Sequence, residues 1–305
     1  MVVGAPLIGI EDLPMQSIYL RLDSEYLHKL SIELNEIYGS KRKAAISLGI
    51  NWTTFRDWFT QRYFMPLWFA IKCHEELNIP IDMLEKNIIE YKGDGTSHLI
   101  KRPILPIKKN PELFNIVGHF VGDGFITSKN VGYVNINEGL LKLMEVRIKN
   151  TFGEMKILYS NSLVGVPTII FPRVIGKIIK HIFDMDFRCR KTRIPEIIFS
   201  STKEEKSAFI RALFDDDGSI RMSRNEITLY SANYYLLKDV QKLLSDLNIK
   251  SNVRQMSKKR EYYVLYVIAD SVFAFSKIIG FEHKEKKVKL ERLVAKRFKQ
   301  CKLTI

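Results

Sequence analysis

One pattern of secondary structure is predicted twice between residues 110 and 300, and this repeat limits the possible folds more than any other feature. Each copy reads as helix, two strands, helix, two strands, helix. The helices carry apolar residues at three- and four-residue intervals, and the strands are short β-branched and aromatic runs between turn residues. We therefore expect an α+β fold that contains a pseudo-twofold pair of αββαββα units, suited to a nearly twofold target.

The segment before the repeat predicts a boundary between domains. Residues 92–112 contain two glycines, three prolines and five basic residues, a composition that disfavours both helices and central strands. We predict a small all-α domain over residues 1–92, a basic linker over 93–110, a first half over 111–200 and a second half over 201–305.

The N-terminal domain contains a stretch, SKRKAAISLGINWTTFRDWF, that resembles a helix-turn-helix. Ala45 would allow close helix approach, Gly49 would occupy the left-handed turn position, and Asn51 or its neighbour would cap the second helix. This arrangement would leave Arg56 and Arg62 available to DNA. A structural or protein-binding role stays open, because this part of the chain is acidic overall.

Charge is distributed unevenly along the chain, whose net charge is +14. Residues 1–100 hold 10 Lys and Arg against 13 Asp and Glu, whereas residues 101–305 hold 38 against 21. Such an excess favours a polyanionic partner, nucleic acid or an anionic membrane surface, although a merely solvated basic surface is the alternative. We expect an intracellular protein, because no apolar run could span a membrane, no secretory signal is evident and three cysteines are scattered.

The opening helix of each repeat copy ends in Asp-Gly, at Asp123 and at Asp217. Small residues on these helices, Gly118 and Gly122 in one and Ala212 in the other, would let the helices pack closely and bring both carboxylates together. Paired carboxylates repel each other unless a hard cation neutralises them, and Mg²⁺ suits such a pair. A lone Asp-Gly is more often a turn, but two in register are hard to explain that way. An EF-hand loop is excluded, because Ile220 stands where its glycine is needed.

Both helices resemble the motif of the LAGLIDADG homing endonucleases, in IVGHFVGDG (residues 116–124) and IRALFDDDG (residues 210–218). The stretches RIPEIIFSSTKEEKSAFIRALFDDDGSI and IIGFEHKEKKVKL are also similar to this family, so the resemblance covers nearly two thirds of the chain. It implies metal binding by Asp123 and Asp217, with Gly122 and Asp216 also at the metal site. It further implies basic residues that polarise water or hold phosphates, for which Lys156, Lys258 and Lys259 are candidates, although ordinary phosphate contacts are the alternative for each.

The same resemblance implies that the strands of each half line the major groove. Candidate DNA-facing residues are Asn135, Asn137, Tyr230, Ser231, Arg254 and Tyr263, and the sequence leaves open which face of each strand is directed to DNA. Four residues depart from the motif: His119 and Val121 in the first copy, Arg211 and Asp216 in the second. Asp216 is bulky and charged where a small residue is common, so we expect it to splay the helix ends or enlarge the metal site.

The resemblance implies a monomeric, site-specific endonuclease that hydrolyses double-stranded DNA with Mg²⁺ or Mn²⁺. Two other functions remain open: a transcription regulator that binds DNA without cutting it, and a maturase that binds structured intron RNA. The chain has no Ser/His/Asp or Cys/His arrangement and no phosphate-binding loop of the Walker type. It also lacks the N-terminal Cys and C-terminal His-Asn of a self-splicing intein.

Overall fold

The computed structural model describes residues 6–95, 98–162, 165–188, 190–256 and 262–302. They form two compact units, and each is described separately. Unit 1 takes residues up to 108 together with 149–157 and 171–182, and unit 2 takes 109–148, 158–170 and 183 onward. Unit 2 begins at residue 109, close to the predicted start of the first half at 111, whereas segments 149–157 and 171–182 of the first repeat copy belong to unit 1.

Unit 1 combines helices with a sheet, so the prediction of a small all-α domain was wrong. Its helices are α1 (Ser24–Tyr38), α2 (Lys41–Ser47), α3 (Trp52–Phe59), α4 (Leu67–Glu76), α5 (Ile81–Asn87) and most of α8 (Arg173–Phe183), with the 3-10 turns η1 (Ile10–Asp12) and η2 (Met15–Ser17). The antiparallel sheet has the order β3 (Met65–Pro66), β2 (Tyr19–Leu22), β4 (Ile88–Lys92), β5 (Ile100–Lys101) and β9 (Glu154–Met155).

The segment predicted as a linker contributes two strands. Besides β5, it supplies β6 (Ile107–Lys108), which pairs with β1 (Leu7–Ile8). β5 lies between β4 and β9, contrary to the expectation that this segment avoids central strands. Ile100 and Ile107 are both fully buried, and their burial outweighs the poor strand propensity of the surrounding prolines and glycines.

The predicted helix-turn-helix is present within unit 1. Gly49 adopts φ 76°, a left-handed conformation that an L side chain would strain, and it separates α2 from α3. The Asn51 side chain accepts a hydrogen bond from the Thr53 backbone N at 2.9 Å and so caps α3. Ala44 and Ala45 are fully buried. The turn and cap were therefore predicted correctly.

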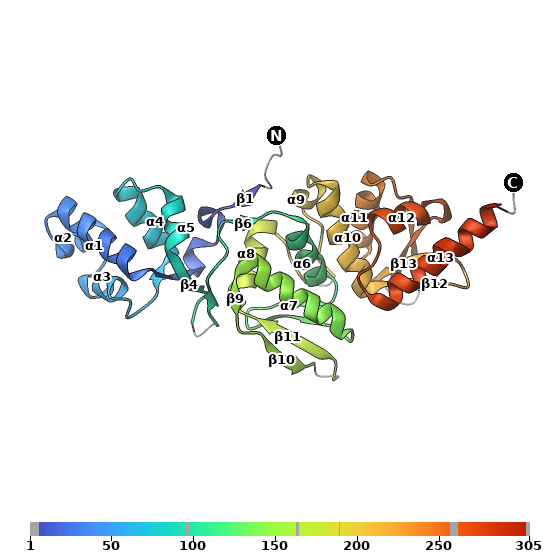
Figure 1. Ribbon diagram of the computed structural model, residues 1–305, viewed down its shortest axis with the longest axis horizontal. Coiled ribbons are helices and arrows are strands. Elements are labelled where there is room, and N and C mark those ends of the chain that lie inside the picture. Colours follow the sequence, from blue (N-terminus) through green and yellow to red (C-terminus); the bar gives the residue numbers. More distant parts are fainter. Residues whose placement is uncertain (1–5, 96–97, 163–164, 189, 257–261, 303–305) are drawn as a thin grey trace. The chain divides into compact units, whose positions relative to one another are not determined.

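Unit 2 contains the two helices that carry the repeated motif, together with two four-stranded sheets (Figure 1). The first copy comprises α6 (Pro111–Val121), β7 (Gly124–Ile126), β8 (Val131–Val134), α7 (Glu138–Phe152), β10 (Leu158–Asn161) and β11 (Pro167–Phe171), with sheet order β10-β11-β8-β7. The second comprises α10 (Lys203–Asp217), β12 (Gly218–Arg221), β13 (Glu226–Ser231), α11 (Tyr234–Asp246), β14 (Ser251–Gln255), β15 (Tyr263–Val267) and α12 (Val272–Ile278), with sheet order β12-β13-β15-β14.

Three further elements complete unit 2: α9 (Glu196–Phe199), the 3-10 turn η3 (Ala269–Ser271) and the long basic helix α13 (Lys284–Lys302). The α+β class is as predicted, and so is the element order of the second copy. The first copy follows the same order when α8, most of which lies in unit 1, is counted as its closing helix, but it has the extra strand β9 between α7 and β10. In the part of the chain that the structure describes, no helix is both long and apolar enough to cross a bilayer.

Helices α6 and α10 lie side by side, and their backbones approach closely at one glycine (Figure 1). A Cβ atom added at Gly118 would lie 2.5 Å from the Phe209 carbonyl oxygen and 2.7 Å from the Ala212 Cβ. Because both helices begin at the same end of the pair, this approach brings their carboxyl ends, and the two Asp-Gly sequences, together.

Replacing Gly118 by alanine should destabilise the protein, although alanine favours helix formation by about 1 kcal/mol over glycine. The added methyl group would overlap the backbone of α10, and overpacking of this kind costs about 1–3 kcal/mol. Urea denaturation of wild type and Gly118→Ala would measure the difference in the free energy of unfolding. An equal or higher stability of the variant would contradict the close packing described above.

Candidate active site

The two aspartates of the repeated motif occupy the carboxyl ends of α6 and α10. Asp123 directly follows the C-cap of α6 and is half-buried, and Asp217 is the last residue of α10 and is exposed. Burial, followed by the charges of Asp216 and Asp217, raises the pKa of Asp123 to about 7. Desolvation by neighbouring groups, followed by the charge of Asp216, raises the pKa of Asp217 to about 6. Water screens part of this shift, because Asp217 reaches solvent. The structure therefore brings together the two predicted carboxylates.

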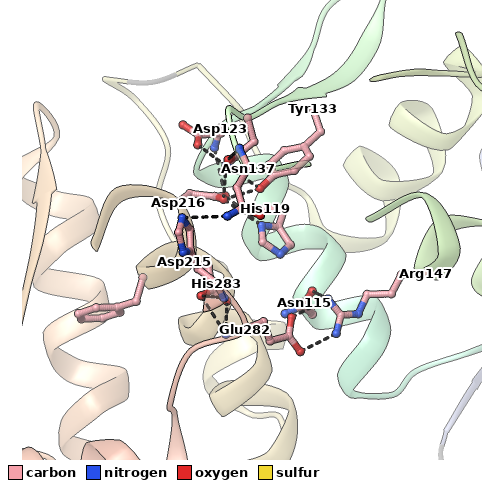
Figure 2. Close-up of polar contacts among 12 residues, drawn as sticks. Asn115, His119, Asp123, Tyr133, Asn137, Arg147, Asp215, Asp216, Glu282 and His283 are labelled. Carbon is pink, nitrogen blue, oxygen red and sulfur yellow. Dashed lines mark hydrogen bonds and ion pairs between the residues drawn. The ribbon is translucent and has the colours of Figure 1, made fainter. Parts of the chain in front are cut away.

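A third carboxylate, that of Asp216, lies buried between the two helices (Figure 2). It accepts hydrogen bonds from Tyr133 Oη at 2.5 Å, from His119 Nδ1 at 3.0 Å and from the Asp123 backbone N at 3.3 Å. A Cβ atom at Gly122 would lie 2.4 Å from Asp216 Oδ2, so the missing side chain of Gly122 makes room for this carboxylate. The expectation that Asp216 splays the helix ends was wrong.

His119 and Asp216, two of the four departures from the motif, are partners across the helix interface. His119 is completely buried. Burial acts to lower its pKa, but the charge of Asp216 and its hydrogen bond outweigh burial and raise it. Since buried charges are tolerated only when paired, each of the two unusual residues accounts for the other.

Asn135 was predicted to face DNA, and the structure corrects this. The side chain is buried, and its Nδ2 donates to Asp123 Oδ2 at 3.0 Å, to Tyr133 Oη at 3.0 Å and to Asp216 Oδ1 at 3.2 Å. Asn135 therefore orients the carboxylate of Asp123 instead of reaching toward a groove. Asn137 caps α7, because its Oδ1 accepts from the Leu140 backbone N at 3.1 Å, and its Nδ2 lies 3.2 Å from His283 Nε2.

The residues just before and within α13 wrap around the carboxyl end of α10. The carboxylate of Asp215 accepts hydrogen bonds from the backbone N of Glu282 and His283, at 3.0 and 2.9 Å. Burial raises the pKa of Asp215 to about 6, and these two hydrogen bonds oppose the shift. Glu282 also forms a bidentate ion pair with Arg147 of α7, at 2.6 and 2.7 Å (Figure 2). One segment therefore ties α10 to a helix of the first copy.

Lys286 is a residue of this site that the sequence analysis missed. Its Nζ donates to the carbonyl oxygens of Phe214, Asp215 and Asp216, at 3.1, 2.5 and 3.1 Å. Burial lowers the pKa of Lys286, while the carboxylates around it act to raise it. A cation at the negative end of a helix dipole is stabilising. The lysine-rich run after FEH was visible in the sequence, but only tertiary structure distinguishes Lys286 from its neighbours.

Of the three lysines proposed from sequence, the structure describes only Lys156. Lys156 is exposed and belongs to unit 1, where it lines a hollow with His98 and Glu154. Lys258 and Lys259 lie outside the described residues. The roles of the three lysines stay predictions.

Strand register separates the two faces of the second sheet, and the face that carries Tyr230 and Arg254 also holds the buried residues Thr228 and Val264. Thr228 pairs with Tyr266 and Tyr230 with Val264, whereas the alternate pair Leu229 and Leu265 belongs to the core. Arg254 pairs with Val264 and therefore shares the outer face of Tyr230. The outer face also carries guanidinium groups over tyrosine rings, Arg221 over Tyr230 at 5.4 Å and Arg254 over Tyr266 at 5.0 Å.

Of the four residues predicted to contact DNA from this sheet, two lie on the face opposite Tyr230 and Arg254. Ser231 and Tyr263 pair with each other and alternate with Tyr230 and Val264, so they lie on the face that α11 covers. The Tyr263 ring lies 5.2 Å from the ring of Tyr234, the first residue of α11. Arg56 and Arg62 are exposed in unit 1.

The carboxylates fit a hard divalent cation that retains water. Asp216 is not free to bind one, because donors occupy both of its oxygens, so its predicted metal role is not supported. No cluster of three or more His, Cys, Asp or Glu among the described residues could by itself hold a metal ion. Mg²⁺ needs no such cage, since it binds one or two carboxylates plus water and substrate phosphate. Asp123 and Asp217, both within reach of solvent and both with raised pKa values, provide that donor set.

Comparison with known protein families finds a match within the second copy. Residues 204–280 match the family model of the LAGLIDADG-like domain. This segment contains the second Asp-Gly motif and the sheet that follows it. The predicted LAGLIDADG resemblance is therefore matched by a family model over residues 204–280.

Several curated proteins share a segment with this chain. A probable translation initiation factor IF-2 of Methanocaldococcus jannaschii is 28% identical over 242 residues, which are 75% of this chain and 20% of that protein. A DNA polymerase of a Thermococcus species is 27% identical over 266 residues, 77% of this chain and 16% of that protein. A ribonucleoside-diphosphate reductase subunit of Bacillus subtilis is 28% identical over 174 residues, 50% and 16% respectively. The chain thus spans a fifth or less of these relatives.

Solved structures of two kinds align with the chain. The homing endonuclease I-DmoI, in complex with DNA and Mn, aligns over 55% of this chain and 96% of its own, with 17% identity and a TM-score of 0.44. Full-length DUF199/WhiA from Thermatoga maritima aligns over 63% of each chain, with 15% identity and a TM-score of 0.40.

Replacing His119 by an apolar residue and Asp216 by a small one should show that the two side chains stabilise each other. His119→Leu alone leaves the buried carboxylate of Asp216 without its imidazole partner, which should cost about 3–5 kcal/mol of unfolding free energy. The double variant with Asp216→Ala removes that charge, so its loss should be smaller than the sum of the single losses by about 2 kcal/mol. Urea denaturation would measure the cycle, with His28→Leu, at an exposed histidine of α1, as control. Additive single losses would contradict the pairing.

Divalent metal binding should weaken as the pH falls through the range of the raised pKa values. A carboxylate must be ionised to bind metal, so below pH 7 binding at Asp123 displaces a proton and the affinity falls by up to about tenfold per pH unit. Below pH 6 Asp217 adds a second proton and steepens the fall. Calorimetric titration with Mn²⁺ between pH 5.5 and 8 would measure this. An unchanged affinity from pH 8 to 6 would show that Asp123 does not bind the metal.

Proposed function

We propose that this chain is a site-specific endonuclease that hydrolyses double-stranded DNA with Mg²⁺ or Mn²⁺. The observation that carries the proposal is the pair of solvent-reaching carboxylates, Asp123 and Asp217, at the adjacent ends of two closely packed helices. The two ionised carboxylates repel each other. A divalent cation bound by both carboxylates and by phosphate oxygens of the substrate would relieve this repulsion. The names of the relatives describe unrelated activities, and so it is the shared segment that is relevant to this chain.

Asp123 and Asp217 would hold the metal, which supplies activation of a water molecule and stabilisation of charge at phosphorus. Asn135 fixes the orientation of the Asp123 carboxylate through its 3.0 Å hydrogen bond. Asp216 holds the backbone N of Asp123, and the buried His119 and Tyr133 hold Asp216 in turn. These contacts keep the site in one geometry before substrate binds, which is how a preorganised site lowers a barrier.

Lys286 provides the fixed positive charge of the site. Three carbonyl oxygens of α10 take its three donors, so Lys286 stabilises the helix end and lessens the repulsion among the carboxylates. The outer face of the β12-β13-β15-β14 sheet, with Arg221, Tyr230 and Arg254, has the cations and aromatic rings suited to phosphates and base edges. On this basis Arg221, which the sequence analysis did not select, joins Tyr230 and Arg254 as a proposed DNA contact.

The proposal is tested by cleavage selection on a random duplex library with Mg²⁺, followed by variants on the selected site. Asp123→Asn and Asp217→Asn should each lower the single-turnover cleavage rate at least about 100-fold, the effect of losing one electrostatic catalytic contact. Their affinity for the same DNA should stay within a few fold of wild type. Asp270→Asn, at an exposed aspartate of η3, is the control and should cut at the wild-type rate.

Other results would replace the proposal. Tight binding of specific DNA without cleavage in Mg²⁺ or Mn²⁺ would indicate a transcription regulator. A preference for structured intron RNA over duplex DNA at equal salt would indicate a maturase. Cleavage by the double Asn variant at the wild-type rate would show that the reaction occurs elsewhere.

A further inference from the structure

The helix-turn-helix carries a cluster of basic residues within an N-terminal segment, residues 1–100, that is acidic overall. Residues 40–64, which form α2, the turn and α3, contain five Lys or Arg and one Asp. The rest of residues 1–100 contains five Lys or Arg and twelve Asp or Glu. The charge of residues 1–100 is therefore segregated, with the net positive part on the helix-turn-helix.

Three of these cations lie where they oppose the stability of their own helix. Lys41, Arg42 and Lys43 form the first turn of α2, are all exposed, and have no acidic residue beside them in that turn. Positive charge at the amino end of a helix is unfavourable, because the helix dipole is positive there. Folding of α2 therefore does not account for this cluster, whereas attraction to a polyanion does.

Helix α3 is anchored on one face only. The Phe55 ring is fully buried and stacks on Phe59 at 4.4 Å, and the Trp58 ring lies 4.8 Å from that of Phe69. The opposite face presents Thr53, Arg56 and the C-cap residue Thr60, which are spaced three and four residues apart and are all exposed. Aromatic contacts thus hold α3 firmly while a polar and basic stripe remains open.

We propose that this α2–α3 surface, made of Lys41, Arg42, Lys43, Thr53, Arg56 and Arg62, is a second binding surface for duplex DNA. The cations of α2 would contact phosphates, and the exposed stripe of α3 would enter the major groove, which is about 12 Å wide and admits one helix. Charge complementarity selects a polyanion, and an exposed polar and basic stripe on a helix whose other face is packed favours a grooved duplex over an acidic protein. The inference extends the proposed function, since the same DNA would be the substrate.

The test compares two variants of the full chain that lose equal charge from unit 1. Arg42→Gln with Lys43→Gln removes two cations of the surface. Lys29→Gln with Lys86→Gln removes two cations outside the surface, whose side chains are 69% and 67% exposed. Each of these lysines forms an ion pair within its own helix. Binding to a mixed-sequence duplex of about 40 base pairs, with EDTA to prevent cleavage, is followed by fluorescence anisotropy from 50 to 300 mM salt.

The surface variant should bind about tenfold more weakly, and the slope of log K against log salt should fall by about 1.8, or 0.9 for each lost phosphate contact. The control variant should match wild type. Equal behaviour of the two variants, or equally strong competition by polyaspartate and by unlabelled duplex, would overturn the inference. Because this binding assay needs no cleavage, loss of the endonuclease proposal and loss of this second surface would be told apart.

Discussion

The close approach of α6 and α10 is the contact on which the rest of the site depends. With Gly118 against the backbone of Phe209, no side chain separates the two helices there, and their carboxyl ends meet. Three consecutive aspartates of α10 and Asp123, which follows the C-cap of α6, consequently lie close together. Such crowding is unfavourable in itself, as the raised pKa values of Asp123, Asp215 and Asp217 indicate. The protein offsets it in a different way for each carboxylate.

Asp215 receives backbone hydrogen bonds, Asp216 receives His119 and Tyr133, and Lys286 places a fixed cation on the end of α10. Asp123 and Asp217 alone keep access to solvent without a direct cationic partner in the described structure. The compensation is therefore selective. The carboxylates that build the site are satisfied within the protein, and the two that remain available are those a metal ion would complete.

Clusters of positive charge lie outside the carboxylate site. Cations over aromatic rings lie on the outer face of the second sheet in unit 2, and a cluster of cations lies on α2 and α3 in unit 1. Neither group is needed to hold its element in place, because the cores beneath are apolar and fully buried. Both clusters are suited to a long polyanion, because the free energy of binding grows with the number of weak phosphate contacts.

The sequence by itself determined the repeat, the two Asp-Gly sequences, the small residues of the helix interface and the Gly49 turn, because these depend on local periodicity and on backbone space. Tertiary structure decided the rest. Strand pairing assigned Tyr230 and Arg254 to the open face and Ser231 to the covered one, since a shift of one residue reverses the face. Only folding brought Asn135, His119 and Lys286 to the carboxylates, because residues far apart along the chain become partners through packing that no local pattern records.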